Sequence, residues 1–338
     1  MDKRIIGQQR DQDGLLLIHK FGWMRAKELG CMLWPSSGRP AVNASELIGK
    51  WKRNRWVLVR PLPDHMGQAL VLSAAGAAYL HSVGYSDAVT GKDWGETEAG
   101  KWVTPRTWRH ELLALGLLTH LNNQGWQVIP ERQLRRENST SQYPDGLAIR
   151  GAAVLWIEVE NARKTGILRN QMLKGLILAS RGRAESLSGH VANCALVGYA
   201  IEAKDERGYR LDHRHHVVSA LEKQSPVDVP LAFVALNLTG TAGVRQVTLE
   251  NITVKANRVS QLVTTIPWQC RPPTPDSYAY EYFTSDGLEY RCGTGNFGWW
   301  WSICRDGHEL AADDAGSENE ARRAVVAEYN IREWGFLR

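Results

Sequence analysis

The first eighty residues contain short apolar runs that recur with helical spacing and are separated by polar turns. Two such runs within 14–34 flank a Gly-Trp pair, which predicts a helix, a turn and a second helix. Asn43 or Ser45 is expected to cap a third helix, because the apolar residues after them fall on one stripe that can be buried. The segment therefore begins with three short helices.

The pattern changes to strands after the third helix. Two β-branched and aliphatic runs, 57–60 and 69–72, are joined by a turn-rich segment and predict a hairpin, and Ser73 is expected to cap a further short helix. Three helices followed by a hairpin and a helix are the order of a winged helix-turn-helix domain, which we predict for residues 1–85.

The middle of the chain alternates between helical and strand-like patterns. Glycines within 81–103 suggest a linker, and Thr104 with Pro105 predicts the cap and first turn of the next helix. The elements expected from there on are a helix at 105–123, strands near 126–131, 145–150 and 153–160, a helix at 166–180 and a strand at 194–201. This order predicts an αβββαβ core in a second domain, 104–255.

A second linker, rich in proline, precedes a C-terminal region with alternating strand patterns and one capped helix. We expect a small α+β domain at 277–338, so the fold class predicted for the whole chain is multidomain α/β. Trp299, Trp300 and Trp301 are consecutive, so the middle one should face away from its neighbours in a strand.

Composition and charge narrow the class of protein. The 338 residues are 43% hydrophobic, which is ample for folded cores and excludes general disorder. Five scattered cysteines without a C-x-x-C pair predict neither a disulfide framework nor a strong zinc site. A polar start and the lack of a long apolar stretch argue against secretion and membrane spanning, so we expect a cytoplasmic protein.

The formal charge of +5 hides an uneven distribution. Residues 1–63 hold twelve basic and five acidic groups, whereas 276–338 hold six basic and twelve acidic groups. The basic end predicts binding to double-stranded DNA, with phosphate and groove contacts from the third helix and the hairpin. The residues expected to make them are Lys50, Lys52, Arg53, Asn54, Arg55 and Arg60.

Two other interpretations of these charged ends stay open. A basic helix face can simply be solvated, and winged helices also serve as protein-docking modules. The acidic C-terminal domain with its tryptophan run points to a protein partner, and a homodimer is a further alternative.

Carboxylates in the middle domain suggest a site for metal binding or catalysis. Glu158 and Glu160 lie within one predicted strand and therefore project from the same face, and Asp145 lies at the entry of the neighbouring strand. An apolar strand rarely carries two carboxylates on one face unless they meet water, cations or a ligand. Three acids form the oxygen-rich set that Mg²⁺ or Mn²⁺ prefers, and Glu111 on the preceding helix is expected to assist.

The element order, the Pro144-Asp145 pair and the Glu158-x-Glu160 motif resemble the PD-(D/E)XK nuclease superfamily. More narrowly, a winged helix followed by HEL at 110–112, PDG at 144–146 and IEVEN at 157–161 is similar to the replication-relaxation family of plasmid and mobile-element proteins. The resemblance covers about residues 10–240 and implies a metal-dependent DNA endonuclease.

One position departs from the superfamily pattern. The usual lysine two places after the acid is Glu160 in this chain, and some restriction enzymes of the superfamily carry glutamate there and remain active. Lys164 or Lys174 is expected to supply the positive charge from a new position.

Two alternatives to an enzyme remain. The three acids can pair with Arg150, Arg163 and Lys164 in a non-catalytic sheet, which would make the chain an accessory or regulatory DNA-binding protein for plasmid replication, relaxation or mobilisation. A protein-interaction factor that uses the winged helix and the acidic tail is the other alternative.

Overall fold

The computed structural model describes most of the chain, with the largest gaps near the C-terminus. The described residues are 3–91, 94–99, 101–140, 142–162, 164, 166–204, 208, 210–225, 228–238, 244–255, 269–271, 280–285, 288–295, 298–306, 308–315, 317–318, 320–322 and 325. The chain divides into two compact units, Met1–Val217 with Pro230–Thr253, and Val218–Val229 with Val254–Arg338. The boundaries of the three predicted domains stay a prediction.

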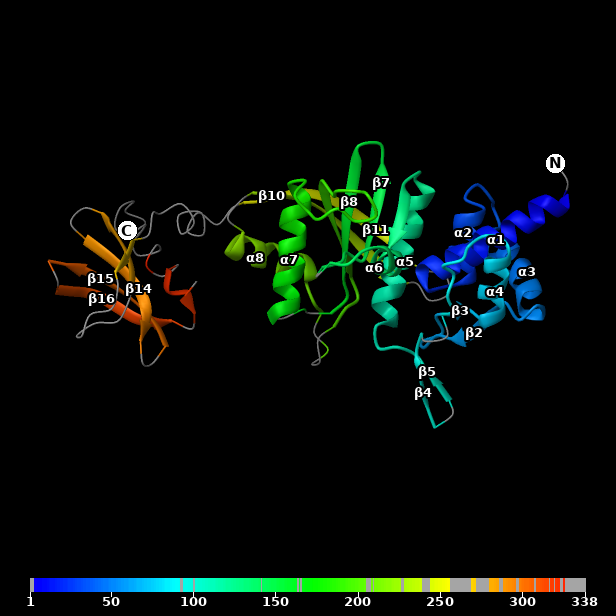
Figure 1. The fold of residues 1–338 in the computed structure, drawn as a ribbon, viewed down its shortest axis with the longest axis horizontal. Coiled ribbons are helices and arrows are strands. Elements are labelled where there is room, and N and C mark those ends of the chain that lie inside the picture. The colour runs from blue at the N-terminus through cyan, green and yellow to red at the C-terminus, as the bar shows by residue number, and fades with distance from the viewer. Residues whose placement is uncertain are drawn as a thin grey trace. The chain divides into compact units, whose positions relative to one another are not determined.

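The N-terminal part of the first unit follows the predicted order of helices and strands (Figure 1). Its elements are α1 Lys3–Phe21, β1 Trp23–Met24, α2 Ala26–Leu33, α3 Pro40–Arg53, β2 Val57–Pro61, β3 Gln68–Leu72 and α4 Ala74–Ser82. The strands form an antiparallel sheet in the order β1-β3-β2. Ser73 caps α4 as predicted, because its Oγ accepts a hydrogen bond from Gly76 N at 3.0 Å.

Close approach between helices explains two features of this sequence. A Cβ on Gly30 of α2 would lie 2.3 Å from the carbonyl oxygen of Pro40, so only glycine lets α2 meet the start of α3. Trp51 of α3 is fully buried, and its Nε1 donates to Asp11 Oδ1 of α1 at 2.8 Å. These contacts fix α3 against α1 and α2.

Two predicted helix starts are wrong. The third helix begins at Pro40, where proline fits the first turn, and neither Asn43 nor Ser45 caps it because both lie inside the helix. The middle helix, α5 Trp108–Asn123, begins three residues after Pro105, so Thr104 is not its cap.

The middle of the chain forms a six-stranded sheet in the order β11-β10-β9-β8-β7-β6. Its strands are β6 Gln127–Pro130, β7 Gly146–Arg150, β8 Ala153–Glu160, β9 Cys194–Ala200, β10 Val229–Leu238 and β11 Val244–Val254. Neighbouring strands run antiparallel from β6 to β8 and parallel from β8 to β10. The sequence pattern does not predict the helix α6 Glu131–Glu137, because its residues are mostly polar and lack an apolar stripe.

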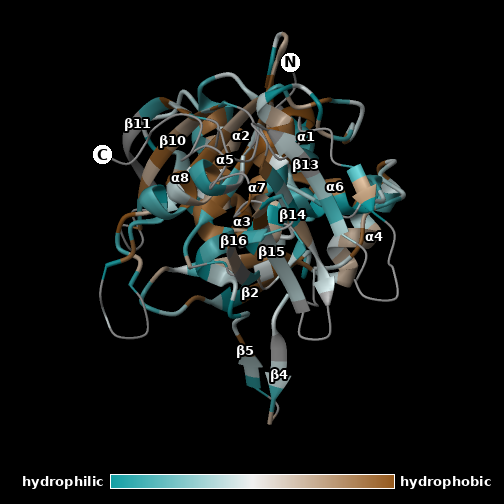
Figure 2. Ribbon diagram, turned by 90° about the vertical axis from the view of Figure 1, so that its left-hand side faces the viewer, coloured by the Kyte–Doolittle hydropathy of each residue, from teal (hydrophilic) through white to brown (hydrophobic). Residues whose placement is uncertain are grey.

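Helices cover both faces of this sheet. Leu113, Leu117 and Leu118 of α5 pack in one core with Ile157 and Val159 of β8. The helix α7 Gly166–Ser180 contacts β8 and β9 and packs near Trp156, whose side chain points to the opposite face. In Figure 2 much of the hydrophobic colour lies on the packed helices and strands, for example around α2 and α5.

The second unit contains an antiparallel five-stranded sheet in the order β12-β13-β14-β15-β16. Its strands are β12 Gln269–Arg271, β13 Tyr280–Ser285, β14 Leu288–Gly295, β15 Gly298–Arg305 and β16 His308–Ala315. Trp299 and Trp301 pack on a core that includes Ala321 and Val325, whereas the ring centre of Trp300 lies 6.1 Å from that of Tyr280. Trp300 therefore faces away from its two neighbours, as strand alternation predicts. Most of the predicted C-terminal helix lies outside the described residues. Among the described helices, none is long and apolar enough to cross a membrane.

Candidate functional site

Asp145 is held beside the central strand β8 by backbone hydrogen bonds. Its N–H donates to Ile157 O at 2.9 Å, and its Oδ2 accepts from Val159 N at 2.7 Å. The residue directly precedes β7, so the antiparallel β7–β8 register places it next to the end of β8. The carboxylate therefore has a fixed position at the edge where β8 ends.

Glu158 and Glu160 share one face of β8, as their spacing predicts. Their side chains are only 7% and 4% exposed, whereas Ile157 and Val159 pack on the opposite face. Trp156, on the same face as the two acids, donates from Nε1 to Glu158 Oε1 at 2.9 Å. Two carboxylates are thus buried side by side, which is costly unless a cation neutralises them.

Lys164 supplies such a cation. Its Nζ lies 2.7 Å from Glu160 Oε1 and 3.5 Å from Glu158 Oε2. Burial alone would lower the pKa of Lys164, but the carboxylates Glu158, Glu160 and Asp145 outweigh burial and raise it above its ordinary value. Lys164 is one of the two lysines expected from the sequence to provide the missing positive charge.

His110 is the site residue that sequence reasoning missed. It lies in the first turn of α5, and its Nε2 is 2.8 Å from Asp145 Oδ1. Burial would lower the pKa of His110, but the charge and hydrogen bond of Asp145 outweigh burial and raise it to about 9. Burial would raise the pKa of Asp145, but the cationic imidazole outweighs burial and holds this pKa below its usual range. A signal existed, because His110 shares a helical stripe with Ala114 and Leu118, residues that face the sheet side of α5.

The carboxylates remain short of positive charge despite these partners. Burial and repulsion from Asp145 raise the pKa of Glu158 to about 8, and burial raises the pKa of Glu160 as well. Strongly shifted carboxyl groups of this kind cluster at functional sites, since structure must hold them against their electrostatic cost.

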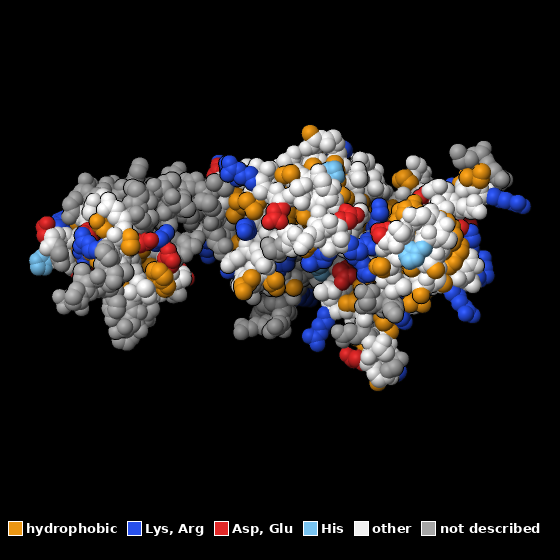
Figure 3. All heavy atoms as spheres, viewed as in Figure 1, with side chains coloured by type: hydrophobic (Ala, Val, Ile, Leu, Met, Phe, Trp, Pro, Cys, Tyr) orange, Lys and Arg blue, Asp and Glu red, His pale blue; other side chains and the backbone are white. Residues whose placement is uncertain are grey.

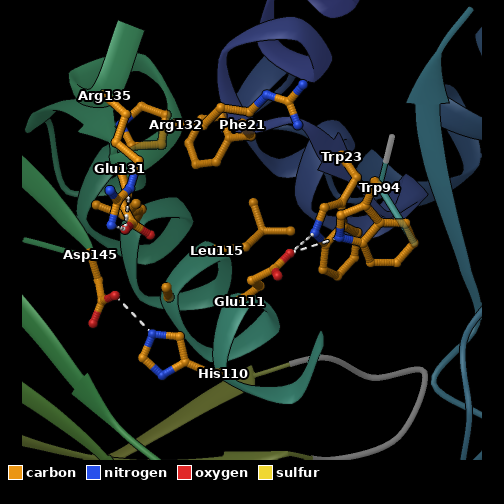
Figure 4. Close-up of a pocket in the computed structure, with 13 residues that line it drawn as sticks. Phe21, Trp23, Trp94, His110, Glu111, Leu115, Glu131, Arg132, Arg135 and Asp145 are labelled. Carbon is orange, nitrogen blue, oxygen red and sulfur yellow. Dashed lines mark hydrogen bonds and ion pairs between the residues drawn. The ribbon is translucent and has the colours of Figure 1, made fainter. Parts of the chain in front are cut away.

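Glu111 does not join this cluster, which corrects its expected role. Its Oε2 accepts from Trp23 Nε1 at 2.6 Å and from Trp94 Nε1 at 2.8 Å (Figure 4). Its Oε1 accepts from Thr107 Oγ1 at 2.5 Å. Glu111 and the next residue, Leu112, lie on the side of α5 that faces the N-terminal elements. Glu111 therefore joins α5 to β1 and to the segment around Trp94.

Other expected partners of the acids lie elsewhere. Lys174 is exposed on α7, and the structure shows no contact between its side chain and the described carboxylates. The Arg150 guanidinium lies 4.3 Å from the centre of the Trp126 ring. Arg163 lies outside the described residues.

A pocket of about 230 Å³ is lined by His110 and Asp145 but not by Lys164. Its walls come from the end of α1, from β1, from α5 and from α6, as Figure 4 shows. Glu131 lines the pocket, and burial with repulsion from Asp145 raises the pKa of its carboxyl group. The lining residues are Phe21, Trp23, Trp94, His110, Glu111, Ala114, Leu115, Leu118, Pro130, Glu131, Arg132, Arg135 and Asp145.

The expected DNA-binding residues lie at the C-terminal end of α3 and in β2. Residues 52–55 are exposed, and Arg55 adopts a left-handed backbone with φ of 55° that ends the helix. Lys50 instead pairs with the buried carboxylate of Asp11, and Arg60 lies 5.6 Å from the centre of the Trp102 ring. Figure 3 shows Lys and Arg side chains standing out from this N-terminal part of the chain.

No family model, curated protein or solved structure matches the chain.

Proposed function

We propose that the chain is a DNA-binding, metal-dependent endonuclease that hydrolyses phosphodiester bonds. The observation that carries the proposal is the meeting of Asp145, Glu158 and Glu160 with the ammonium of Lys164 at the end of one central strand. Metal-dependent phosphodiester hydrolysis uses such a set, because carboxylates hold the ion and a cationic side chain stabilises charge on the phosphate.

The fold supports the same proposal. From α5 to β9 the chain runs helix, three strands, helix and strand, with the short α6 inserted after the first strand. This is the order of the PD-(D/E)XK core that the sequence resembles. The N-terminal order of α1 to α4 with the β2–β3 hairpin supports a winged helix that binds duplex DNA.

The donor chemistry fits a divalent ion, although a metal would have to compete with Lys164. Across the part of the chain that the structure describes, no three His, Cys, Asp or Glu side chains are grouped to hold a metal. The ammonium of Lys164 nevertheless occupies the place of a cation between Glu158 and Glu160. We infer that Asp145, Glu158 and Glu160 would hold Mg²⁺ or Mn²⁺ when Lys164 turns toward the phosphate. A bound ion would lower the pKa of a water molecule and polarise the phosphodiester.

The chain's own residues at this site then have separate roles. Asp145 is oriented by Val159 N and by His110, which keeps its carboxylate ionised. Glu158 is positioned by the Trp156 indole. Lys164 stabilises negative charge that develops on the phosphate in the transition state.

A second function is favoured by the same ion pairs. Lys164 already pairs with both Glu158 and Glu160, as expected for a non-catalytic sheet that supports an accessory or regulatory DNA-binding protein. In that case the acids stabilise the sheet and no metal enters.

Nicking of supercoiled plasmid DNA in the presence of Mg²⁺ or Mn²⁺ separates the two functions. The native chain should nick DNA, while Asp145→Asn and Glu158→Gln should be at least a hundredfold slower, because an amide cannot replace the charge that holds the ion. Glu98→Gln, which changes an exposed acid outside the site, should cut at the native rate. The accessory function is favoured if the native chain binds DNA yet cuts supercoiled, linear and single-stranded forms no faster than the Asp145→Asn protein.

Glu160→Lys adds a diagnostic for the position that departs from the superfamily pattern. Nicking should survive if Glu160 only occupies the place of the usual lysine, and should be lost if its carboxylate holds the ion. A circular dichroism spectrum that matches the native chain would show that lost nicking comes from the loss of a metal ligand and not from unfolding of the variant.

A further inference from the structure

We propose that the pocket between Phe21, Leu115 and Glu131 binds one unstacked base of a single-stranded DNA segment whose neighbouring phosphate lies at Asp145. This inference deepens the proposed nuclease function and rests on it for the position of the phosphate. It assigns a substrate class to a cavity that adjoins the acidic cluster and that Asp145 lines, whereas Glu158 and Glu160 do not.

The size and lining of the pocket fit a single base. Its volume of about 230 Å³ lies below the range of roughly 300–1,000 Å³ typical of sites for drug-sized ligands. Phe21, Leu115 and Leu118 supply apolar wall, and the indoles of Trp23 and Trp94 close one end (Figure 4). A flat, uncharged ring system of one or two rings is the ligand that such walls accept, because every base has a π-face.

The mouth of the pocket lies beside basic side chains that suit DNA phosphates. Its apolar wall of Trp23 and Trp94 is buried, whereas the side chains of Arg135, Glu131 and His110 are 57%, 35% and 28% exposed, so the mouth lies on their side. Arg132 and Arg135 of α6 both line the pocket. Guanidinium groups at the mouth complement the phosphates on either side of an inserted base.

Polar groups inside the pocket can recognise the base edge. Glu131 Oε1 accepts a hydrogen bond from Arg135 Nε at 2.7 Å, and the terminal nitrogen of the same guanidinium lies 2.6 Å from this oxygen in an ion pair. No contact of Glu131 Oε2 with another residue of the described chain is shown, so this oxygen is available to a base edge. The Trp23 and Trp94 N–H groups are already used by Glu111, so these rings offer only their surfaces.

Asp145 connects the pocket to the proposed chemistry. It lines the pocket through its pair with His110 and also contacts β8 through Val159 N, so it stands between the pocket and Glu158. A base held in the pocket would therefore place the adjoining phosphate near the carboxylates. Duplex DNA cannot enter in this way without opening, because its bases are stacked inside the helix. The site thus selects single-stranded or locally opened DNA.

The test measures binding in EDTA, where cleavage plays no part. A short oligodeoxythymidylate is compared with a fully abasic strand of equal length, so that both ligands carry the same phosphates and differ only in their bases. The native chain should prefer the strand with bases by about 5-fold to 150-fold, the range expected for stacking of one base on an aromatic wall.

Two variants place this preference in the pocket. Ala114→Phe fills the cavity and should remove the preference, whereas Ala114→Ser leaves the space open and should keep it. If Ala114→Phe does not fold, Phe21→Leu provides the second test, because it keeps an apolar side chain but removes the stacking surface. Loss of the preference in Phe21→Leu supports the pocket.

The outcomes separate this inference from the proposed nuclease. Equal binding of both strands by the native chain overturns the pocket assignment, as does a preference that survives in both Ala114→Phe and Phe21→Leu. A free thymidine monophosphate that occupies the pocket more tightly than the strand also overturns it in favour of a nucleotide site. Absence of metal-dependent nicking with an intact, pocket-dependent base preference instead removes the nuclease and leaves a single-strand binding site.

Discussion

The Nε2 atom of His110 lies 2.8 Å from Oδ1 of Asp145, and this pair joins the first turn of α5 to the residue that precedes β7, beside the acids of β8. The interaction makes His110 a cation at neutral pH and Asp145 an anion. Both partners are largely shielded from solvent, with side chains 28% and 11% exposed. The stability of the fold should therefore depend on pH through this pair.

The free energy of unfolding should fall between about pH 6.5 and pH 9. The pKa of His110 is raised from 6.5 to about 9, so its contribution is fully present below 6.5 and is lost as the pH rises through 9. The loss should be at most about 3 kcal/mol. Urea unfolding of the native chain and of His110→Gln across this range measures it. The histidine makes no such contribution if both proteins lose stability in parallel.

Glu158→Gln should make the protein more stable above neutral pH while lowering metal-dependent activity. The pKa of Glu158 is raised from 4.5 to about 8, so the folded chain binds the extra proton and loses stability as the pH rises from 4.5 through 8. The uncharged amide avoids this loss, which amounts to at most about 5 kcal/mol. Chemical denaturation at pH 5 and pH 8 gives the difference, and Glu98→Gln serves as the control. A variant that is less stable than the native chain at both pH values contradicts the prediction.

Sequence patterns predicted the acids and two candidate lysines, but not which lysine pairs with the acids or which residue of α5 contacts Asp145. Strand alternation is a local rule, so Glu158 and Glu160 could be placed on one face without knowledge of the rest of the fold. The choice between Lys164 and Lys174 depends on how the chain turns after β8, and the choice between His110 and Glu111 depends on the rotation of α5 against the sheet. Both are set by long-range packing, which one sequence does not display. The same limit explains α6, whose polar residues fold on contacts with α1 and β6.

Lys164→Met should strengthen metal binding and weaken cleavage. The ammonium of Lys164 occupies the place between Glu158 and Glu160, so its removal leaves two buried carboxylates for a divalent ion to neutralise. Binding of Mn²⁺ should therefore raise the melting temperature more in this variant than in the native chain. Nicking should fall because no cation stabilises the phosphate. Lys174→Met should match the native chain in both measurements, and an unchanged Mn²⁺ response in Lys164→Met argues against competition at this site.

Glu111→Gln should destabilise the first unit without changing the metal response. One carboxylate oxygen accepts from both Trp23 and Trp94, and an amide keeps a single acceptor atom without the charge. The cost should be about 1–3 kcal/mol, because the indole hydrogen bonds lose their charged acceptor and Thr107 Oγ1 loses its acceptor atom. Tryptophan fluorescence during urea unfolding reports the change directly. Loss of the Mn²⁺ shift in a folded Glu111→Gln protein would return Glu111 to the acidic site.

At the basic end of α3, Lys52, Arg53 and Arg55 are the residues that we expect to bind DNA, whereas Lys50 stabilises the fold. Residues 52–55 are exposed, so replacing Lys52, Arg53 and Arg55 with alanine should reduce the slope of log affinity against log salt by as much as about 2.7, at roughly 0.9 for each phosphate that the protein no longer neutralises. Thermal stability should change little.

Lys50→Ala should have the opposite pattern. Its ammonium pairs with Asp11, whose side chain is only 2% exposed, so its removal leaves a buried carboxylate that keeps the hydrogen bond from the Trp51 indole but loses its cation. Because the lysine is 43% exposed, solvent screens the pair, and the expected loss is about 1–2 kcal/mol of stability. Fluorescence anisotropy with a duplex probe over a salt series, together with urea unfolding, measures both properties. If the triple alanine variant keeps the native salt slope, the end of α3 does not bind phosphates, and docking of a protein partner becomes the better explanation of this basic surface.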